Sequence, residues 1–210
     1  VGLTIIAMGK TGARELNYIS DVDVVYVARA QDDSLDEDGV VRIATRLATL
    51  AGKAGAASAG EPALWMLDAN LRPEGKDGPL VRTLESHIAY YRRWAKGWEF
   101  QALLKARPIA GDMELGERYI EELSPNVWSA ASRENFVEDS RAMRRRVEDH
   151  VPAREQERQL KLGKGGLRDI EFTVQLLQLV HGRTDETLRK RSTLEAIEAL
   201  RDGGYVARKD

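Results

Sequence analysis

The chain has 210 residues, 42% of them hydrophobic, and its 32 basic and 34 acidic side chains give a formal net charge of -2. This near-neutral balance argues against a bulk nucleic-acid or membrane binder, and no apolar run is long enough to span a bilayer. The sequence has no cysteine, which excludes disulfides and thiolate metal sites and fits a cytoplasmic protein.

The chain opens with two predicted strands separated by a glycine turn. Leu3–Met8 is a short apolar, β-branched run that predicts a buried strand. The segment that follows, GKTGARELN, predicts a turn and a short helix, with Thr11 as its cap. A valine-rich run at residues 22–28 predicts the second strand.

A helix and a third strand are expected next. Ile43, Leu47 and Leu50 recur at i, i+4 and i+7, which marks the apolar face of an amphipathic helix through about Gly52. After a stretch of small residues, an apolar run within residues 63–73 predicts a third strand. Strands that alternate with helices in this order indicate an α/β arrangement.

The sequence is predicted to be helical from Thr83 onward. Ser192 and Glu195 form a capping-box pattern at the start of the last predicted helix, which Gly203 can end. We therefore expect a mixed α/β domain over residues 1–110, truncated at its N-terminus because Val1 stands so near the first strand. A helical bundle domain is expected over residues 111–210.

Two aspartates open the second predicted strand. Successive side chains of a strand point to opposite faces, so Asp21 and Asp23 share one face while Val22 and Val24 point to the other. Two carboxylates this close repel each other unless a cation or a shared proton relieves the repulsion. The pattern therefore predicts a metal site.

Neighbouring residues suggest the chemistry of that site. Gly9 and Lys10 follow the first strand in a turn that could bring backbone N–H groups and an ammonium to a phosphate, although the P-loop spacing is absent. Ser20 directly precedes the aspartate pair, and Asp68 lies on the third predicted strand. Three carboxylates suit Mg²⁺ or Mn²⁺, and two such ions about 3.5–4 Å apart can support an in-line phosphoryl displacement.

Basic side chains could balance phosphate charge at such a site. The candidates are Lys10, Arg14, Arg72, Lys105 and Arg107. Taken singly, an aspartate at a strand end is most often a turn or cap residue, and Arg14, Lys105 and Arg107 are each more often solvated surface charges. The three histidines are scattered along the chain, which argues against a histidine metal site.

Four segments carry a resemblance to a known family. They are MGKTGARELNYISDVDVVY, LDANLRPEGKDGPLV, WEFQALLKARPIAGD and KLGKGGLRDIEFTVQLLQLVHG. Their order and content resemble the bifunctional glutamine synthetase adenylyltransferase/adenylyl-removing enzymes, which are DNA polymerase β-type nucleotidyltransferases. The resemblance implies a polymerase β-like palm followed by a helical bundle.

The resemblance also implies roles for individual residues. It implies metal binding and catalysis by Asp21, Asp23 and Asp68, and contacts to phosphate or nucleotide by Gly9, Lys10, Ser20 and Arg72. One position departs from the family pattern Asp-x-Arg-Leu-Arg-Pro, because Asn70 stands where the family has its first arginine. If that arginine contacts phosphate in the family, Arg72 must suffice here.

The segments GPLV, KARPIAGD and GGLRDIEF are more similar to the adenylyl-removing half of the family than to its adenylylating half. That half uses phosphate to remove AMP from a tyrosine of glutamine synthetase and releases ADP, with Mg²⁺ or Mn²⁺ as the implied metal. One alternative is the adenylylating half, which transfers AMP from ATP to the same tyrosine. Another is a silent module that senses nucleotides or binds a partner. The implied partners are glutamine synthetase and a nitrogen-signalling regulatory protein.

The segment KLGKGGLRDIEF admits two interpretations. Arg168 and Lys164 could meet a phosphate or a partner protein near the start of a helix. Alternatively, the glycines form a helix junction in which Asp169 and Glu171 complement the helix dipole.

Overall fold

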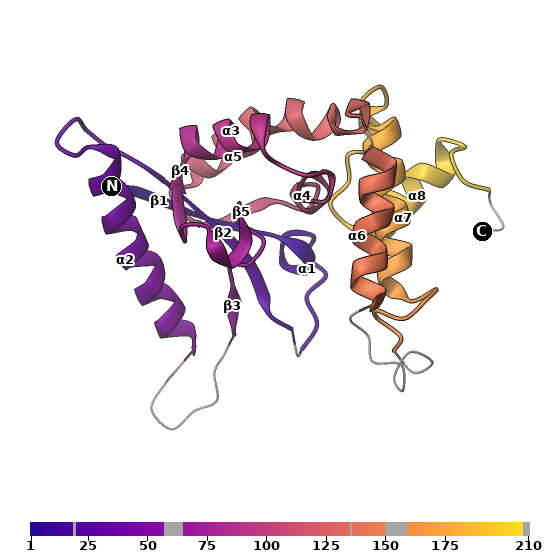
Figure 1. The fold of residues 1–210 in the computed structure, drawn as a ribbon, viewed down its shortest axis with the longest axis horizontal. Helices are drawn as coiled ribbons and strands as arrows, with labels where there is room; N and C mark the ends of the chain where they lie inside the picture. The colour runs from indigo at the N-terminus through magenta and orange to yellow at the C-terminus, as the bar shows by residue number, and fades with distance from the viewer. Residues whose placement is uncertain (19, 57–64, 135, 150–158, 208–210) are drawn as a thin grey trace. The chain divides into compact units, whose positions relative to one another are not determined.

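The computed structural model describes residues 1–18, 20–56, 65–134, 136–149 and 159–207 (Figure 1). The chain forms two compact units. Unit 1 comprises residues 1–95 and 105–124, and unit 2 comprises residues 96–104 and 125–210. No helix in the described ranges combines the length and the apolar character that a membrane crossing requires.

Unit 1 is built on a mixed five-stranded sheet. Its strands are β1 (Gly2–Ala7), β2 (Val22–Arg29), β3 (Leu67–Asp68), β4 (Val81–Thr83) and β5 (Arg107–Gly111). β1 runs antiparallel to β2 and β5, whereas β2 runs parallel to both β3 and β4, which pair with different parts of it. The predicted mixed α/β fold is confirmed.

The third strand is much shorter than expected. β3 has two residues in the described part, and residues 63–64 of the predicted strand lie outside it. β4 and β5 were not predicted, because three residues show too little alternation and because Pro108 reads as a strand breaker. Proline is tolerated in β5 because that strand lies at the edge of the sheet.

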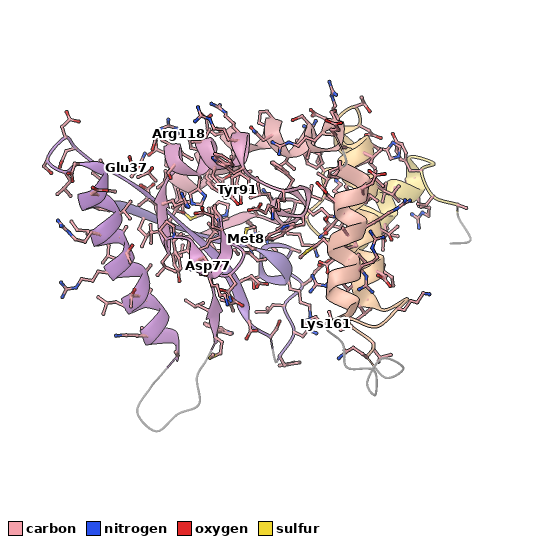
Figure 2. All side chains as sticks on the ribbon, in the orientation of Figure 1. Met8, Glu37, Asp77, Tyr91, Arg118 and Lys161 are labelled. Atoms are coloured by element: carbon pink, nitrogen blue, oxygen red, sulfur yellow. The ribbon has the colours of Figure 1, made fainter. Side chains whose placement is uncertain are left out.

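Within the described residues, four helices accompany this sheet. They are α1 (Gly9–Gly12), α2 (Glu37–Ala56), α3 (Leu84–Arg93) and the first part of α5 (Met113–Trp128), with a short 3₁₀ turn, η1, at Gly75–Asp77. Thr11 does not cap α1, because the helix begins after Met8 and Thr11 lies inside it. Met8 and Tyr91 are buried, whereas Glu37 and Arg118 lie at the surface (Figure 2).

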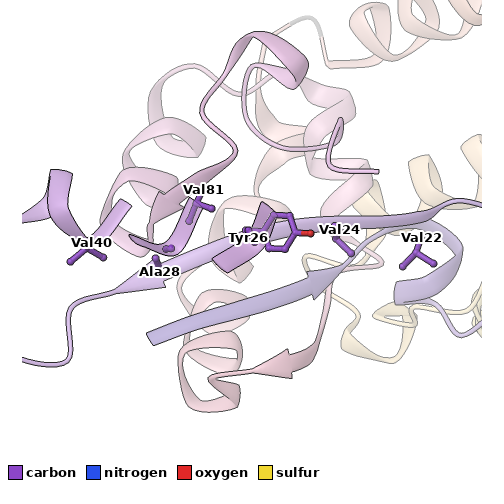
Figure 3. Close-up of a cluster of buried hydrophobic side chains, with 8 residues drawn as sticks. Val22, Val24, Tyr26, Ala28, Val40 and Val81 are labelled. Atoms are coloured by element: carbon purple, nitrogen blue, oxygen red, sulfur yellow. The ribbon is translucent and has the colours of Figure 1, made fainter. Parts of the chain in front are cut away.

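The even-numbered side chains of β2 pack against α2. The cluster, drawn in Figure 3, consists of Val22, Val24, Tyr26, Ala28, Val40, Ala44, Ala48 and Val81. The predicted apolar face of α2 is therefore wrong, because Ile43, Leu47 and Leu50 are 38%, 44% and 55% exposed. β2 contributes the large side chains of this interface, and α2 packs on them through valine and alanine.

The opposite face of the sheet carries α3 and α5. Leu3 and Ile5 pack on the α2 side, so Thr4 points to the other side, where a Cβ on Gly116 of α5 would lie 2.8 Å from Thr4 Oγ1. His87 of α3 stands edge-on to Tyr119 of α5, with ring centroids 5.2 Å apart. The sheet is thus covered on both faces.

Unit 2 is helical. It contains α4 (Gly97–Leu103), the last turn of α5, α6 (Phe136–Asp149), α7 (Leu167–His181) and α8 (Thr193–Asp202), with 3₁₀ turns η2 (Ala130–Ser132) and η4 (Glu186–Leu188). One buried cluster in its described part consists of Val174, Leu188, Ala196 and Leu200. The predicted cap of α8 is confirmed, because the Ser192 side chain accepts a hydrogen bond from the backbone N–H of Glu195.

The chain does not divide at the predicted boundary near residue 110. Residues 96–104 belong to unit 2 because α4 packs against α6 and α7. Residues 105–124 belong to unit 1 because β5 pairs with β1 and because Gly116 packs closely on Pro108. That residues 1–110 form a catalytic domain and residues 111–210 a helical bundle domain stays a prediction.

Candidate active site

Two of the three predicted carboxylates lie side by side on the sheet. Asp23 of β2 is the register partner of Asp68 of β3 in a parallel pair, directly after the partners Val22 and Leu67. Val22 and Leu67 pack against the α2 side, so Asp23 and Asp68 project from the opposite face. The alternation that the sequence predicted around Asp23 therefore places a carboxylate pair on one face of the sheet.

The glycine turn after β1 lies directly against this pair. Gly9 has a φ of +48°, and a Cβ at this position would stand 2.5 Å from Asp23 Oδ2. The backbone N–H of Met8 donates a 2.8 Å hydrogen bond to the Asp23 carbonyl, which fixes the turn to β2. Glycine is required at position 9 both for its conformation and for this close approach.

In the loop after β3, Arg72 forms hydrogen bonds within the loop itself. The Arg72 guanidinium donates hydrogen bonds to backbone carbonyls of the same loop, at 2.8 Å to Ala69 and at 3.1–3.2 Å to Gly78 and Lys76. Asp68 Oδ1 accepts a 2.7 Å hydrogen bond from the backbone N–H of Asn70. Arg72 therefore shapes the loop beside Asp68, and its phosphate contact stays a prediction.

The remaining predicted residues flank the pair. Asp21 is exposed and precedes β2, and Ser20 is partly exposed beside it. Lys10 Nζ donates a 2.7 Å hydrogen bond to Asn17 Oδ1. Among the residues that the structure describes, no group of three or more histidine, aspartate or glutamate side chains is arranged to hold a metal ion. The structure brings Asp23 and Asp68 together without completing a three-carboxylate cluster.

The donor chemistry of the pair nevertheless fits a hard divalent cation. Asp23 and Asp68 offer carboxylate oxygens, which Mg²⁺ and Mn²⁺ prefer. Mg²⁺ is commonly bound through one or two carboxylates together with substrate phosphates, without a cage made wholly of protein ligands. The pair therefore fits the ligand chemistry of such an ion, and its binding here stays a prediction.

Three of the basic residues predicted to balance phosphate charge are either exposed or paired with other groups of unit 1. Arg14 is exposed, with a φ of 62°. Lys105 is buried and donates to Glu15, and Arg107 donates to backbone carbonyls of α1. Glu15 is a residue of this region that the sequence does not predict, because nothing in its neighbourhood indicates a partner 90 positions away.

His87 has no place in this chemistry. Burial is the main cause that lowers the pKa of the imidazole to about 3; a contact to the Tyr26 carbonyl opposes this shift, and the nearby positive charge of Arg82 adds to it. The ring lies between Tyr91 and Tyr119 in the interior of unit 1. His87 is therefore neutral at neutral pH and is a packing residue.

The glycine-rich segment before α7 forms a helix junction. Asp169 accepts hydrogen bonds from Arg144 Nε of α6 and, at 2.6 Å, from the backbone N–H of Gly165. The hydrogen bond from Arg144 is the main cause that lowers the pKa of Asp169. Arg168 stands 4.0 Å from Glu171 on the same helix. This geometry favours the junction interpretation of the segment.

Comparison with known proteins identifies the family. The family model of glutamate-ammonia ligase adenylyltransferase matches residues 1–122, and that of GlnD PII-uridylyltransferase matches residues 141–210.

Three relatives share the printed name bifunctional glutamine synthetase adenylyltransferase/adenylyl-removing enzyme. The one from Leifsonia xyli subsp. xyli is 62% identical over 98% of this chain, the one from Streptomyces avermitilis 60% over 99%, and one from Bifidobacterium longum 55% over 100%. The chain spans about a fifth of their length, 21%, 21% and 20% respectively. Near-complete coverage at this identity shows that the chain belongs to the family of bifunctional glutamine synthetase adenylyltransferase/adenylyl-removing enzymes.

Proposed function

We propose that this chain carries the site for phosphorolytic removal of AMP from an adenylylated tyrosine of glutamine synthetase, with release of ADP. One observation carries the proposal: Asp23 and Asp68 are register partners on one face of the sheet, beside a turn whose Gly9 backbone lies against Asp23. The relatives are named as adenylyltransferase and adenylyl-removing enzymes of glutamine synthetase. A carboxylate pair beside a glycine turn suits phosphoryl chemistry.

The proposed reaction exchanges one phosphorus–oxygen bond for another. An oxygen of inorganic phosphate attacks the phosphorus of the bound AMP group, the bond from phosphorus to the tyrosyl oxygen breaks, and ADP forms. The tyrosyl oxygen leaves as a phenolate, whose ordinary pKa of about 10 makes a strong general acid unnecessary. This agrees with a site in which His87 is buried and neutral.

In this proposal, the residues of the site bind and align the reactants. Asp23 and Asp68 hold Mg²⁺ or Mn²⁺, which would neutralise phosphate charge when bound. The Gly9 turn and Lys10 contact phosphate oxygens, and Ser20 and Asp21 lie at the edge of the site. In-line alignment of two reactants can lower the activation barrier of such a reaction by on the order of 7–11 kcal/mol in favourable cases.

The direction of the reaction rests on sequence segments. GPLV, KARPIAGD and GGLRDIEF favour the adenylyl-removing half, although the two halves share most of their motifs. The second candidate is the adenylylating reaction with ATP, because the printed name of the relatives covers both activities. The regulatory partner and the cytoplasmic location remain predictions from the resemblance and from composition.

The two directions can be separated with one pair of assays. The chain is mixed with adenylylated glutamine synthetase and Mg²⁺, with and without phosphate, and ADP is measured. ADP formed only with phosphate supports the proposal. Adenylylation of unmodified glutamine synthetase by ATP would instead assign the other half. Absence of both products would favour the silent module.

Substitution of the carboxylate pair tests the site. We expect Asp23→Asn or Asp68→Asn to lower the rate by at least about 100-fold, because each removes charge that aligns and neutralises phosphate. EDTA should abolish the activity of the unsubstituted chain, and added Mg²⁺ should restore it. Asp33→Asn, an exposed aspartate in the loop after β2, is the matched control and should keep full activity. Full activity of both site variants would exclude this mechanism.

A further inference from the structure

We propose that Arg107 and Lys105 are positioning residues that fix the α1 turn beside Asp23, and do not themselves bind phosphate. The α1 turn is defined as residues 9–15, which contain helix α1 and the next three residues, whose backbone N–H groups donate to carbonyls of the helix. The inference rests on the proposed function in one respect, because it takes Asp23 to be part of the reactive site. The two residues that fix the turn lie at or just before the start of β5, almost 100 residues farther along the chain.

Arg107 holds the C-terminal end of the turn. Its Nε donates a 3.0 Å hydrogen bond to the Gly12 carbonyl, and its Nη2 donates a 2.9 Å hydrogen bond to the Thr11 carbonyl. The last carbonyls of a helix lack partners within the helix, and a cation there also interacts favourably with the helix dipole. One planar guanidinium therefore donates to two neighbouring carbonyls of a helix too short to be stable alone, and the Thr11 carbonyl also accepts a 3.2 Å hydrogen bond from the backbone N–H of Arg14.

Lys105 holds the turn at a second point. Its side chain is almost fully buried, with the residue 4% exposed, and Nζ donates a 3.1 Å hydrogen bond to Glu15 Oε2. Glu15 is tied back into the turn, since its backbone N–H donates a 2.7 Å hydrogen bond to the Lys10 carbonyl. A buried ammonium is costly unless it is paired, so this pair strongly favours the observed position of the turn.

The backbones of the turn and of β5 also approach closely. A Cβ at Gly12 would lie 1.9 Å from the Lys105 carbonyl oxygen. Ala7, the last residue of β1, pairs with Arg107, so the strand that leads into the turn and the strand that clamps it are adjacent in the sheet. The turn is thus fixed at its C-terminal end by β5, while Gly9 at its other end lies against Asp23.

The hydrogen bonds of Arg107 and Lys105 favour a positioning role over direct phosphate binding. Two N–H groups of Arg107 already donate to carbonyls, and Lys105 Nζ is buried against Glu15. Direct phosphate binding would require Lys105 Nζ to leave its buried position beside Glu15, and Arg107 would have to bind phosphate through a guanidinium whose Nε and Nη2 already hold the turn. A positioning role requires no rearrangement, and it predicts that loss of Arg107 shifts the turn relative to Asp23. A displacement of about 1 Å at a reacting centre can reduce a rate by about 100-fold.

The first test is kinetic. We expect Arg107→Ala to lower kcat for ADP release about 10- to 100-fold, with the KM for phosphate and for adenylylated glutamine synthetase changed less than about threefold. Arg107→Lys should recover part of kcat, because an ammonium can reach one of the two carbonyls but not both. Arg118→Ala, an exposed arginine of α5, is the matched control and should retain the parent kinetics.

The second test follows the turn itself, without substrate. The backbone N–H groups of Gly12, Ala13 and Glu15 donate to carbonyls of Met8, Gly9 and Lys10. We expect these three amides to exchange with deuterium at least about tenfold faster in Arg107→Ala. Glu15→Gln, which removes the charge that pairs with Lys105, should change the exchange in the same direction even if Arg107→Ala does not fold.

A control separates positioning from loss of stability. Ala48→Gly loosens α2, which packs on the face of the sheet opposite Asp23, and should lower unit stability while kcat is retained. The inference is overturned if Arg107→Ala raises the KM for phosphate tenfold with kcat and exchange unchanged, since that result indicates direct phosphate binding. It is also overturned if turn exchange is unaffected. An inactive parent chain would refute the proposed function, whereas the exchange experiment would still decide whether Arg107 fixes the turn.

Discussion

At the scale of single residues, the buried side chain of His87 makes the stability of unit 1 depend on pH. Its ring is fully buried, its Nε2 stands 3.4 Å from the Tyr26 carbonyl, and its Nδ1 has no hydrogen-bond partner within the described residues. Burial lowers the pKa from the ordinary 6.5 to about 3. Between these two pH values the unfolded chain binds a proton that the folded chain does not, so stability falls as the solution is acidified.

We therefore expect the free energy of unfolding to decrease as pH falls below 6.5 toward 3, with a contribution from His87 of up to about 1.4 kcal/mol per pH unit. His87→Gln removes this group and should flatten the pH dependence by that amount. Urea unfolding at pH 7.5, 6.0 and 5.0, followed by circular dichroism, measures the difference. The carboxylates are common to both proteins and cancel in the comparison. Equal slopes would contradict a buried neutral histidine.

The residues of the candidate site were only partly predictable from the sequence. Strand alternation is a local rule, so it correctly placed Asp23 opposite Val22 and Val24. The surroundings of Arg72, Lys105 and Arg107 were not predictable, because their partners are backbone carbonyls or a distant glutamate. A side chain that binds the backbone leaves no signature in residue identity.

At the scale of elements, α2 shows why an apolar stripe can mislead. The sequence contains two stripes on this helix, one of large residues and one of small residues, and the small one is buried. Val40, Ala44 and Ala48 allow the helix to approach the side chains of β2 closely, whereas Leu47 lies on the solvent side. Residue size, which periodicity ignores, decided which stripe faces the sheet.

A pair of substitutions tests this orientation. Ala44→Leu inserts a large side chain into the closed interface and should lower the free energy of unfolding by roughly 1–3 kcal/mol. Leu47→Gln replaces one good helix former by another on the exposed side and should change it by less than about 0.5 kcal/mol. Denaturant unfolding of the two variants measures both effects. The reverse order of the two effects would mean that the face predicted from periodicity is the buried one.

At the scale of the whole chain, the sequence predicted the fold class but not the division into units. The class follows from composition and from the order of strands and helices, which are local features. The division depends on where α4 and α5 pack, and such contacts between distant segments are not encoded in any one stretch. Leu115, Tyr119 and Leu123 recur at i, i+4 and i+8 of α5, all buried in unit 1, beyond the predicted end of the first domain.

Two fragments decide between the predicted boundary and the observed one. Residues 1–110 lack α5, whereas residues 1–128 contain it, and both fragments carry α4 equally. Burial of three large side chains is worth roughly 5–9 kcal/mol at about 1.5–3 kcal/mol each, which is comparable to the whole stability of a typical domain, about 5–15 kcal/mol. We therefore expect fragment 1–128 to show a cooperative thermal transition by circular dichroism and fragment 1–110 to show none. A cooperative transition of equal midpoint in the shorter fragment would restore the boundary near residue 110, because α5 would then contribute nothing to the core of unit 1.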